Sequence, residues 1–477
     1  MLRTITLISG FLLLAECTQL KHRASGVGLV PSNGTKNVNV DTHLVITLPS
    51  SPTIGSVGNI TVRDDEDGRI IDILNLAIPS SPSPFGNGST KANYTDKTTY
   101  QTNIIGGLDF YFFPIIVTEN TATIYLHNNR LEYDRTYSVT VDPGVLSMSN
   151  GSFDGIASDS WTFTTKTKGP VAGQQSVTVC ASGTEDFSTL QGALDWAPSN
   201  SRAPTTIHIR SGTYTELIYF QYKSNLIIRG SSRNSTSIRY PNNSAFNPPN
   251  RQGASRRPAF SFKGVSDIQL ADFSITNLYR GQAEALLIDG TRVTLSNMQL
   301  HGSGDALTTY GTAYITDTIL IGDGDTILGY GAVFWNRSTI ITTAGPVSWT
   351  RTPQGVHGNV LLDCVIRSES RDSTLARLPD NTGGVAPNWP YAEMILINCT
   401  TDGISTIGWG PVQGPPLFNA RNVKFWEYGT VDTEGKAVDY SKRLNVSRQL
   451  TLPTDEEVVR QYSNPAFVLG GWTPGIL

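Results

Sequence analysis

The stretch that decides the fold is GSGDALTTYGTAYITDTILIGDGDTILGYG, residues 302–331, because it carries nearly the same pattern twice. Asp305 and Asp325 each follow a glycine and precede an apolar residue two positions later, and they are twenty residues apart. A repeat this short, made of one strand and one tight turn, predicts a solenoid in which each copy forms one coil.

The same repeat continues on both sides of this stretch. The segments VTLSNMQL from residue 293, AYITDTIL from residue 313 and AVFWNRSTI from residue 332 align at spacings of 20 and 19. The segments VLLDCVI and MILINCT continue the series towards the C-terminus. One such coil cannot bury its own apolar face, so the coils must stack. We therefore predict an all-β fold whose larger part, residues 176–477, is a right-handed parallel β-helix. The polar residues expected to stack at the strand ends are Asn297, Asp317, Asn336, Asp363 and Asn398.

This register brings the two repeated aspartates together. Asp305 lies eight residues after Asn297, and Asp325 lies eight residues after Asp317. Neighbouring strands are about 4.8 Å apart, so the carboxylates should lie within several ångströms of each other. Two acids that close cannot both ionise freely, and a pair with separated pKa values can act as nucleophile and general acid. Repetition alone leaves three alternatives open: structural turn residues, a calcium site, or a glycosidase pair.

Residues 26–166 have a different pattern. HLVITLP, NITVRD, TATIYLH, TYSVTVD and SWTFTT alternate apolar and polar residues, and Asp67-Gly68 and Asp142-Pro143-Gly144 supply turn signals. The pattern predicts a β-sandwich. The run NRLEYDRTYSVTVDPGVL resembles the bacterial Ig-like domains of secreted carbohydrate-active proteins. We expect this domain to be a spacer without a ligand, joined to the solenoid by a linker at residues 165–174.

The composition fits two β-rich domains. The 477 residues include 45 Gly and 26 Pro, and only 16% of them are charged. The net charge is −4 and the pI is near 5.9, so the chain has no excess of positive charge with which to bind nucleic acid.

The first residues favour export from the cell. Residues 1–17, MLRTITLISGFLLLAEC, combine an early arginine with an apolar run too short to cross a bilayer, which predicts a signal peptide and a secreted protein. Cys17 would be a lipid anchor if the host were bacterial. No later segment is long and apolar enough to cross a membrane.

If the host is eukaryotic, the protein is expected to be a glycoprotein. The ten Asn-x-Ser/Thr sequons are Asn33, Asn59, Asn87, Asn93, Asn150, Asn234, Asn242, Asn336, Asn398 and Asn445.

Two other site chemistries find little support in the sequence. The chain has few histidines and no Gly-x-Ser-x-Gly motif, which argues against a serine esterase. Cys364 and Cys399 follow two of the stacking residues, so they either stack in the core or form a disulfide. They lack the spacing of zinc ligands.

Several segments in order resemble the pectin methylesterases, carbohydrate esterase family 8. VTVCASGTEDFSTLQGALDWAP is similar to the opening strand and first helix of that family, and IRSGTYTELIYF is similar to its Gly-x-Tyr-x-Glu motif. GQAEALLIDG, GSGDALTTY, GDGDTILG and TLARLP resemble its four catalytic motifs. The resemblance continues through IGWGP, FWEYGT and YSKRLNVSRQLT to GGWTPGI, and so covers nearly all of residues 176–477.

The resemblance implies a catalytic set. It assigns Asp325 as the nucleophile, Asp305 as the general acid/base, Gln282 as an oxyanion donor and Arg377 as the residue that orients the nucleophile and substrate. The implied substrate is pectin or a related methyl-esterified polyuronate, hydrolysed by a monomer that needs no metal or other cofactor. Trp389 and Trp409 are the predicted substrate-binding aromatics, with core packing the equal alternative for Trp409. Glu216 is expected to be structural.

The sequence also departs from the family pattern. Gly304 stands where the family has a glutamine that helps to hold the oxyanion, and one such donor is worth about 10²- to 10³-fold in rate. Leu378 and Pro379 replace a Pro-Trp pair, and three motif aromatics are replaced by Thr308, Thr326 and Leu328. The rival functions are therefore a β-helix protein that binds acidic polysaccharide with weakened catalysis, or an esterase acting on another uronate ester.

Overall fold

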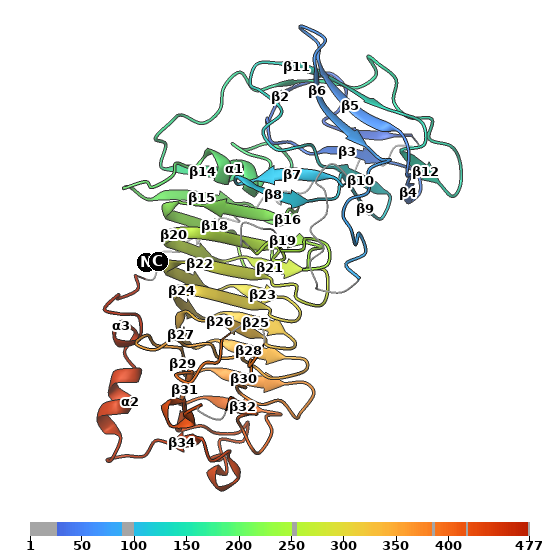
Figure 1. Cartoon of the computed structure of the whole chain (residues 1–477). Helices are drawn as coiled ribbons and strands as arrows, with labels where there is room; N and C mark the ends of the chain where they lie inside the picture. The colour runs from blue at the N-terminus through green and yellow to red at the C-terminus, as the bar shows by residue number, and fades with distance from the viewer. Residues whose placement is uncertain (1–25, 88–99, 250–254, 384–386, 416–417, 476–477) are drawn as a thin grey trace, which may run out of the picture.

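The computed structural model describes residues 26–87, 100–249, 255–383, 387–415 and 418–475. A two-sheet sandwich lies at one end of a long stack of parallel strands (Figure 1). The predicted signal peptide and Cys17 lie outside the described residues. Within these ranges, no helix is long and apolar enough to span a membrane.

Each predicted alternating run of the N-terminal region forms a strand of the sandwich. Its core includes the fully buried Tyr137, Trp161 and Phe163. One sheet has the order β2 (Thr35–Val38), β13 (Thr162–Thr165), β11 (Thr136–Val141), β5 (Asn59–Asp64) and β6 (Ile70–Asn75). The other has the order β1 (Gly28–Val30), β3 (Leu44–Thr47), β10 (Thr121–Ile124) and β9 (Ile115–Thr118), and a short pair joins β4 (Pro52–Ile54) to β12 (Leu146–Met148).

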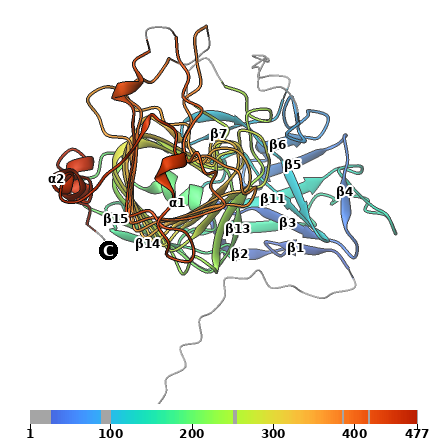
Figure 2. The same cartoon turned by 90° about the horizontal axis from the view of Figure 1, so that it is seen from below.

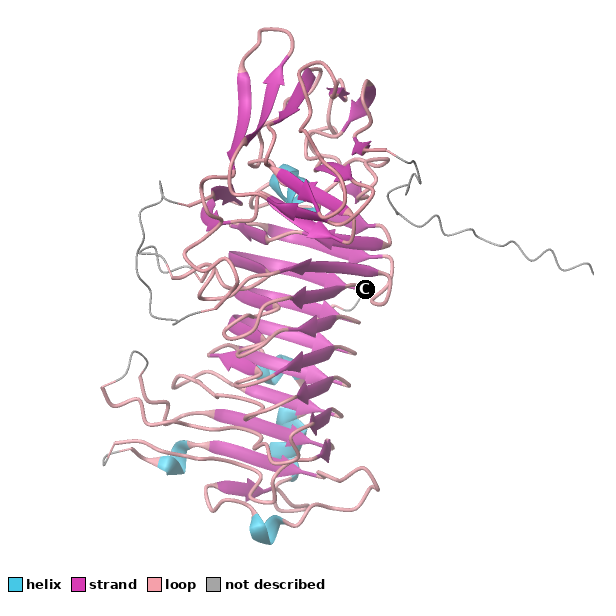
Figure 3. Ribbon diagram, turned by 90° about the vertical axis from the view of Figure 1, so that its right-hand side faces the viewer, coloured by secondary structure: helices cyan, strands magenta, loops and turns pink. Residues whose placement is uncertain are grey.

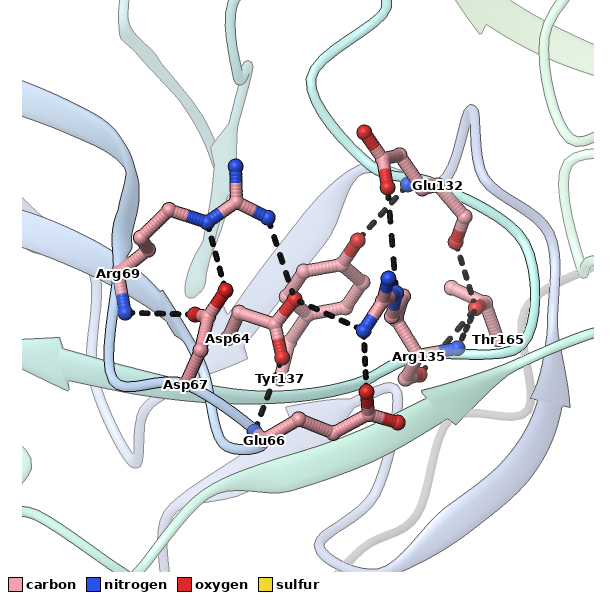
Figure 4. Close-up of polar contacts among 8 residues, drawn as sticks. All are labelled: Asp64, Glu66, Asp67, Arg69, Glu132, Arg135, Tyr137 and Thr165. Carbon is pink, nitrogen blue, oxygen red and sulfur yellow. Dashed lines mark hydrogen bonds and ion pairs between the residues drawn. The ribbon is translucent and has the colours of Figure 1, made fainter.

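A polar network ties the start of β11 to its neighbours (Figure 4). The Tyr137 hydroxyl accepts a hydrogen bond from the main-chain N–H of Glu132 at 2.8 Å, and Thr165 Oγ1 donates to the carbonyl of Glu132 at 2.7 Å. Arg135 pairs with Glu66 beside them. A tyrosine that bonds back to the main chain a few residues upstream is typical of Ig-like sandwiches. Membership of this sandwich in that family stays a prediction.

The larger unit is a right-handed parallel β-helix, as predicted. Figure 2 shows it nearly end-on as a closed ring, and Figure 3 shows its strands as a ladder. The longest sheet runs through β14 (Ser176–Val179), β15 (Thr205–Ile209), β18 (Ser224–Gly230), β20 (Phe260–Ala271), β22 (Leu286–Ser296), β24 (Leu307–Thr316), β27 (Ala332–Asn336), β29 (Asn359–Leu362), β31 (Glu393–Ile397), β33 (Lys424–Tyr428) and β34 (Ser447–Gln449). The second runs through β16 (Gly212–Thr215), β19 (Thr236–Tyr240), β21 (Ser274–Asn277), β23 (Gln299–His301), β25 (Ile319–Gly322), β28 (Thr339–Thr342), β30 (Val365–Ser368) and β32 (Thr400–Asp402).

The first halves of three long strands form a separate face, and this face carries the predicted site. The register of β22 against β24 shifts after the Gly290–Gly311 pair, where the chain turns from one face to the next. A Cβ on Gly311 would lie 1.7 Å from the carbonyl oxygen of Gly290, so only glycine fits this close approach. The face also contains β17 (Ile218–Gln221), which pairs with β20, and β26 (Ile327–Gly329), which pairs with β24.

One position of the predicted polar stack is wrong. Asn336 pairs with Thr316 inside the sheet, and the next residue, Arg337, occupies the turn position equivalent to Asp317. Arg337 and Asp317 have left-handed φ angles of 46° and 52°. The third coil therefore repeats at a spacing of 20 rather than 19, and it places an arginine where the polar pattern suggested an asparagine.

Short helices cover parts of the solenoid. Helix α1 (Leu190–Trp196) begins at Thr189, whose side chain accepts from the N–H of Gly192. Helices α2 (Glu456–Tyr462) and α3 (Pro465–Val468) place Tyr462 and Val468 against the outer face of the long sheet, beside Phe334. Two 3₁₀ turns, η2 (Ala420–Asn422) and η3 (Tyr440–Lys442), lie in the last coils.

The sandwich packs directly against the first coils. Asp41 accepts hydrogen bonds from the N–H groups of Ser188 and Thr189, at 3.0 and 2.8 Å, at the start of α1. The hairpin of β7 (Thr102–Ile105) and β8 (Leu108–Tyr111) contributes Ile105 and Phe110 to the β-helix core. These contacts dock the sandwich against the first coils, in addition to the linker predicted at residues 165–174.

Two expectations about single residues are corrected. Cys364 and Cys399 are buried free thiols that stack in the core, so the disulfide alternative is wrong. Asn242 is fully buried and donates to the carbonyls of Arg256 and Pro258 at 2.7 and 2.8 Å, so the folded protein cannot carry a glycan there.

Candidate active site

Three carboxylates occupy one column of the β-helix. Leu286, Leu307 and Ile327 pair in register on consecutive coils. Glu284, Asp305 and Asp325 each lie two residues before one of these positions. The structure therefore brings Asp305 and Asp325 to equivalent places on adjacent coils, as predicted, and adds Glu284 on the coil before them.

Asp325 is held by Arg377. Arg377 Nε donates to Asp325 Oδ1 and its Nη2 donates to Oδ2, both at 2.7 Å. Arg377 reaches this position because its main chain pairs with Trp349, and its guanidinium lies 5.2 Å from the centre of the Trp349 ring. Parallel hydrogen bonds from the two edges of a guanidinium fix both the position and the orientation of a carboxylate. Asp325 is 8% exposed, so it is largely but not completely shielded from solvent.

Asp305 has a different arginine. Arg257 Nη2 donates to Asp305 Oδ2 at 3.1 Å, and its Nε donates to Glu284 Oε1 at 2.7 Å. Glu284 is fully buried and also accepts from Thr308 Oγ1 at 3.2 Å. Burial raises the pKa of Asp305 to about 7; Arg257 opposes this rise, and the negative charges of Glu284 and Asp325 add to it. Asp305 can therefore carry and lose a proton near neutral pH.

The glycine at position 304 belongs to a tightly held turn. Gly304 has a left-handed φ of 51°, and a Cβ on it would lie 2.8 Å from the main-chain nitrogen of Gln282. Its own N–H donates to Asp323, which also accepts from Ser303 Oγ at 3.0 Å. The turn thus has no room for a glutamine side chain, and its N–H is already engaged.

Gln282 lies beside this turn. Its neighbour Ala283 pairs with Ser303 through two main-chain hydrogen bonds of 2.8 and 3.0 Å. Gln282 is half-buried with a φ of 50°, and its side-chain amide bonds to no other residue that the structure describes. The amide is therefore free to donate to a ligand.

An aromatic stack borders the carboxylates. Tyr310 and Tyr330 stack at a centroid distance of 4.5 Å, and Tyr330 stacks on Trp389 at 6.2 Å. Tyr330 is 44% exposed. These rings, on consecutive coils and on the loop that follows Arg377, offer flat apolar surface beside the site.

The prediction that Trp409 binds substrate is wrong. Its ring is fully buried, it stacks on Phe425 at 4.7 Å, and its Nε1 donates to Glu427 at 2.8 Å. The alternative of core packing holds. Thr326 and Leu328, which replace two family aromatics, are also buried.

Glu216 has the structural role expected of it. Its two carboxylate oxygens accept from the N–H groups of Leu190 and Gln191 at 3.1 and 3.0 Å, at the start of α1. Burial raises its pKa to about 7. Glu216 directly follows β16, which lies several strands before β23 and β25 in the second sheet, the strands that precede Asp305 and Asp325 (Figure 1).

Sequence reasoning missed four polar residues of the site. These are Arg257, Glu284, Asp323 and Arg351. Glu284 and Asp323 could have been found from the sequence, because the register of the repeat places them in the same series of turns as the two aspartates. Arg257 and Arg351 had none, since their positions depend on loops whose paths the repeat does not specify. The residues that the structure describes contain no group of three or more His, Cys, Asp or Glu side chains arranged to hold a metal ion.

The comparisons with known proteins identify the family. The model named Pectinesterase matches residues 176–471, more than half of the chain. A probable pectinesterase 8 from Arabidopsis thaliana is 24% identical over 298 residues, covering 60% of this chain and 72% of the relative. A pectinesterase from Ralstonia nicotianae is 25% identical over 283 residues, covering 52% and 69%.

Solved structures agree on the fold of this region. A pectin methylesterase from Erwinia chrysanthemi superposes with a TM-score of 0.51 at 20% identity, covering 64% of this chain and all of that one. The pectin methylesterase from carrot gives a TM-score of 0.51 at 19% identity, covering 65% and all of that chain. The chain belongs to the pectinesterase family.

Proposed function

We propose that the protein hydrolyses the methyl esters of galacturonate units in pectin, releasing methanol. One observation carries the proposal: the two carboxylates at equivalent positions differ in environment. Asp325 is gripped by Arg377 through two bonds of 2.7 Å, while Asp305 has a pKa raised to about 7. An ionised nucleophile beside a protonated acid is what acyl transfer from an ester requires.

In the first step, an Asp325 oxygen attacks the ester carbonyl carbon of the substrate. The carbonyl oxygen gains negative charge, and the free amide of Gln282 donates a hydrogen bond to it. The tetrahedral intermediate collapses, the bond from carbon to the methoxy oxygen breaks, and Asp305 gives its proton to that oxygen. Methanol leaves, and Asp325 is joined to the substrate acyl group as a mixed anhydride.

In the second step, Asp305 is ionised and acts as a base. It removes a proton from a water molecule, and the hydroxide oxygen attacks the acyl carbon. The bond to Asp325 breaks, which releases the galacturonate unit as its carboxylic acid and restores ionised Asp325 and protonated Asp305; the released acid then gives its proton to water. Arg377 keeps Asp325 in line for attack throughout.

The substrate is proposed to lie across the face that carries both aspartates. Tyr330 and Trp389 supply stacking surface for sugar rings, and Arg377 attracts the acidic polymer.

Pectin is an extracellular polymer, so we further propose that the protein is exported. The exposed sequons then become candidates for glycosylation, with the buried Asn242 excluded.

The proposal is tested by measuring methanol release from highly methylated pectin. The wild type is expected to release methanol, and Asp325→Asn is expected to lose at least about 10³-fold in kcat, because the amide is a poor nucleophile. Wild-type protein that binds pectin without releasing methanol from any methyl-esterified uronan would favour the polysaccharide-binding function. Release of an alcohol other than methanol, from another uronate ester alone, would favour an esterase of different specificity.

A further inference from the structure

Arg351 is the arginine of the site that has no partner. It interacts electrostatically with Asp305, Asp325, Tyr310 and Arg257. However, it forms no hydrogen bond or ion pair with any residue that the structure describes, and its Nε is buried. The two other site arginines, Arg257 and Arg377, each contact a carboxylate.

Arg351 is nevertheless held in place. Its guanidinium stacks on the ring of Trp349 with its central carbon 3.5 Å from the ring centroid. The same ring lies 5.2 Å from the guanidinium of Arg377. Trp349 therefore fixes two arginines next to each other, one committed to Asp325 and one free, because a guanidinium is attracted to the face of an indole ring.

Arg351 is half-buried, and the buried N–H group at its Nε is costly unless an acceptor pairs with it. A guanidinium keeps its charge at any pH that proteins tolerate, and removing it from water without a hydrogen-bond acceptor is unfavourable. The Nε1 atoms of Trp349 and Trp389 are also buried donors without an acceptor among the described residues. These three N–H groups are therefore available to donate hydrogen bonds to a bound ligand.

We infer that Arg351 binds an anionic oxygen of the substrate. The inference rests on the proposed function and extends it by naming a residue that the catalytic set did not include. Two sources supply such an oxygen: the ester carbonyl oxygen as it gains charge in the transition state, and the carboxylate of a neighbouring de-esterified uronate. The N–H of Gly304 is bonded to Asp323 and is not free to donate to the oxyanion, which leaves room for Arg351 in that role.

The test compares Arg351→Gln and Arg351→Lys with wild type. Arg371→Gln is the matched control, because Arg371 lies on a later turn with a side chain that is 74% exposed. If Arg351 binds the transition-state oxygen, Arg351→Gln lowers kcat by about 10²-fold on fully methylated substrate with little change in KM. If it binds a carboxylate, KM rises selectively on partially de-esterified pectin. In both cases Arg351→Lys recovers part of the loss, because the charge is kept.

A binding measurement separates this inference from the proposed function. Calorimetric titration with trigalacturonate needs no turnover, so it works even if the wild type releases no methanol. A loss of affinity of about tenfold or more in Arg351→Gln supports the carboxylate source. Unchanged kcat, KM and trigalacturonate affinity in a folded Arg351→Gln variant overturn the inference. So does an Arg351→Lys variant that folds normally and is as impaired in kcat and KM as the glutamine variant.

Discussion

Asp305 and Asp325 lie at the same register position of consecutive coils, yet each carboxylate faces a different arginine. Arg377 holds Asp325 through two parallel hydrogen bonds, whereas Arg257 contacts Asp305 through one and shares itself with Glu284. A repeated coil would give both aspartates the same surroundings if its neighbours repeated as well. The arginines come from non-repeating loops, and they make the two acids chemically unequal.

The pH dependence of activity should shift in opposite directions when the partners of Asp305 are changed. As an acid, Asp305 must carry a proton, so kcat/KM should fall as the pH rises through its pKa of about 7. Arg257 lowers that pKa, so Arg257→Gln should move the alkaline limb upward by about one unit. Glu284 raises it, so Glu284→Gln should move the limb downward.

Both variants are tested by measuring kcat/KM for methanol release from pH 4 to 10. Arg292→Gln serves as the control, because Arg292 pairs with Asp267 at the surface of the same sheet. Shifts of the same sign in Arg257→Gln and Glu284→Gln would rule out Asp305 as the group that sets the alkaline limb.

Replacing Arg377 by lysine should cost activity although the charge is kept. A lysine has no second edge to match both oxygens of Asp325, so the nucleophile loses its fixed orientation. We expect kcat to fall by about 10²-fold in Arg377→Lys, a loss typical of misplaced reacting groups. Steady-state methanol release measures this, and wild-type kcat in the lysine variant would contradict an orienting role.

Adding a side chain at Gly304 should destabilise the turn rather than restore a donor. Gly304→Ala combines a left-handed backbone, worth about 1–2 kcal/mol, with a contact of 2.8 Å to the nitrogen of Gln282. Gly281→Ala is the matched control, since Gly281 has a φ of 74° and open space around its Cβ position. Chemical denaturation should show a larger loss for Gly304→Ala. A Gly304→Gln variant with raised kcat would refute this account.

Removing the carboxylate of Asp41 should weaken the first coil. Asp41 accepts from Ser188 and Thr189 at the start of α1, and loss of such capping bonds costs about 1–3 kcal/mol. Asp41→Ala should therefore lower the unfolding midpoint of the β-helix. Asp67→Asn, a change at an exposed turn of the sandwich, should leave the midpoint unchanged. Equal midpoints for Asp41→Ala and wild type would show that the contact adds no stability.

The sequence predicts the parts of the fold that follow from local repetition. Asp305 and Asp325 share a column because the twenty-residue period fixes which residues meet on adjacent coils. The same reasoning failed at Asn336, because a one-residue error in alignment moves a polar residue from the turn into the strand. A sequon similarly says nothing about burial, and Asn242 is part of the core.

The contacts that distinguish the two acids depend on packing between distant segments. Arg257 precedes β20 and reaches two coils forward to Asp305, and Arg351 is placed by the ring of Trp349. No periodic pattern marks such residues. Trp409 was predicted wrongly for a different reason. A tryptophan in a glycine-rich turn has the same sequence surroundings whether its ring binds a sugar or packs into the core.

The docking of the sandwich also bears on the order in which the chain folds. A solenoid begins with a coil that has no preceding coil to pack on, and terminal coils need a cap. Domains near the N-terminus generally fold first during synthesis. Asp41 and the hairpin that carries Phe110 precede Thr189 and the first strand of the β-helix in the chain, so they are synthesised first. We therefore expect the sandwich to offer the first coil a surface to pack on, from which the solenoid extends towards its catalytic coils.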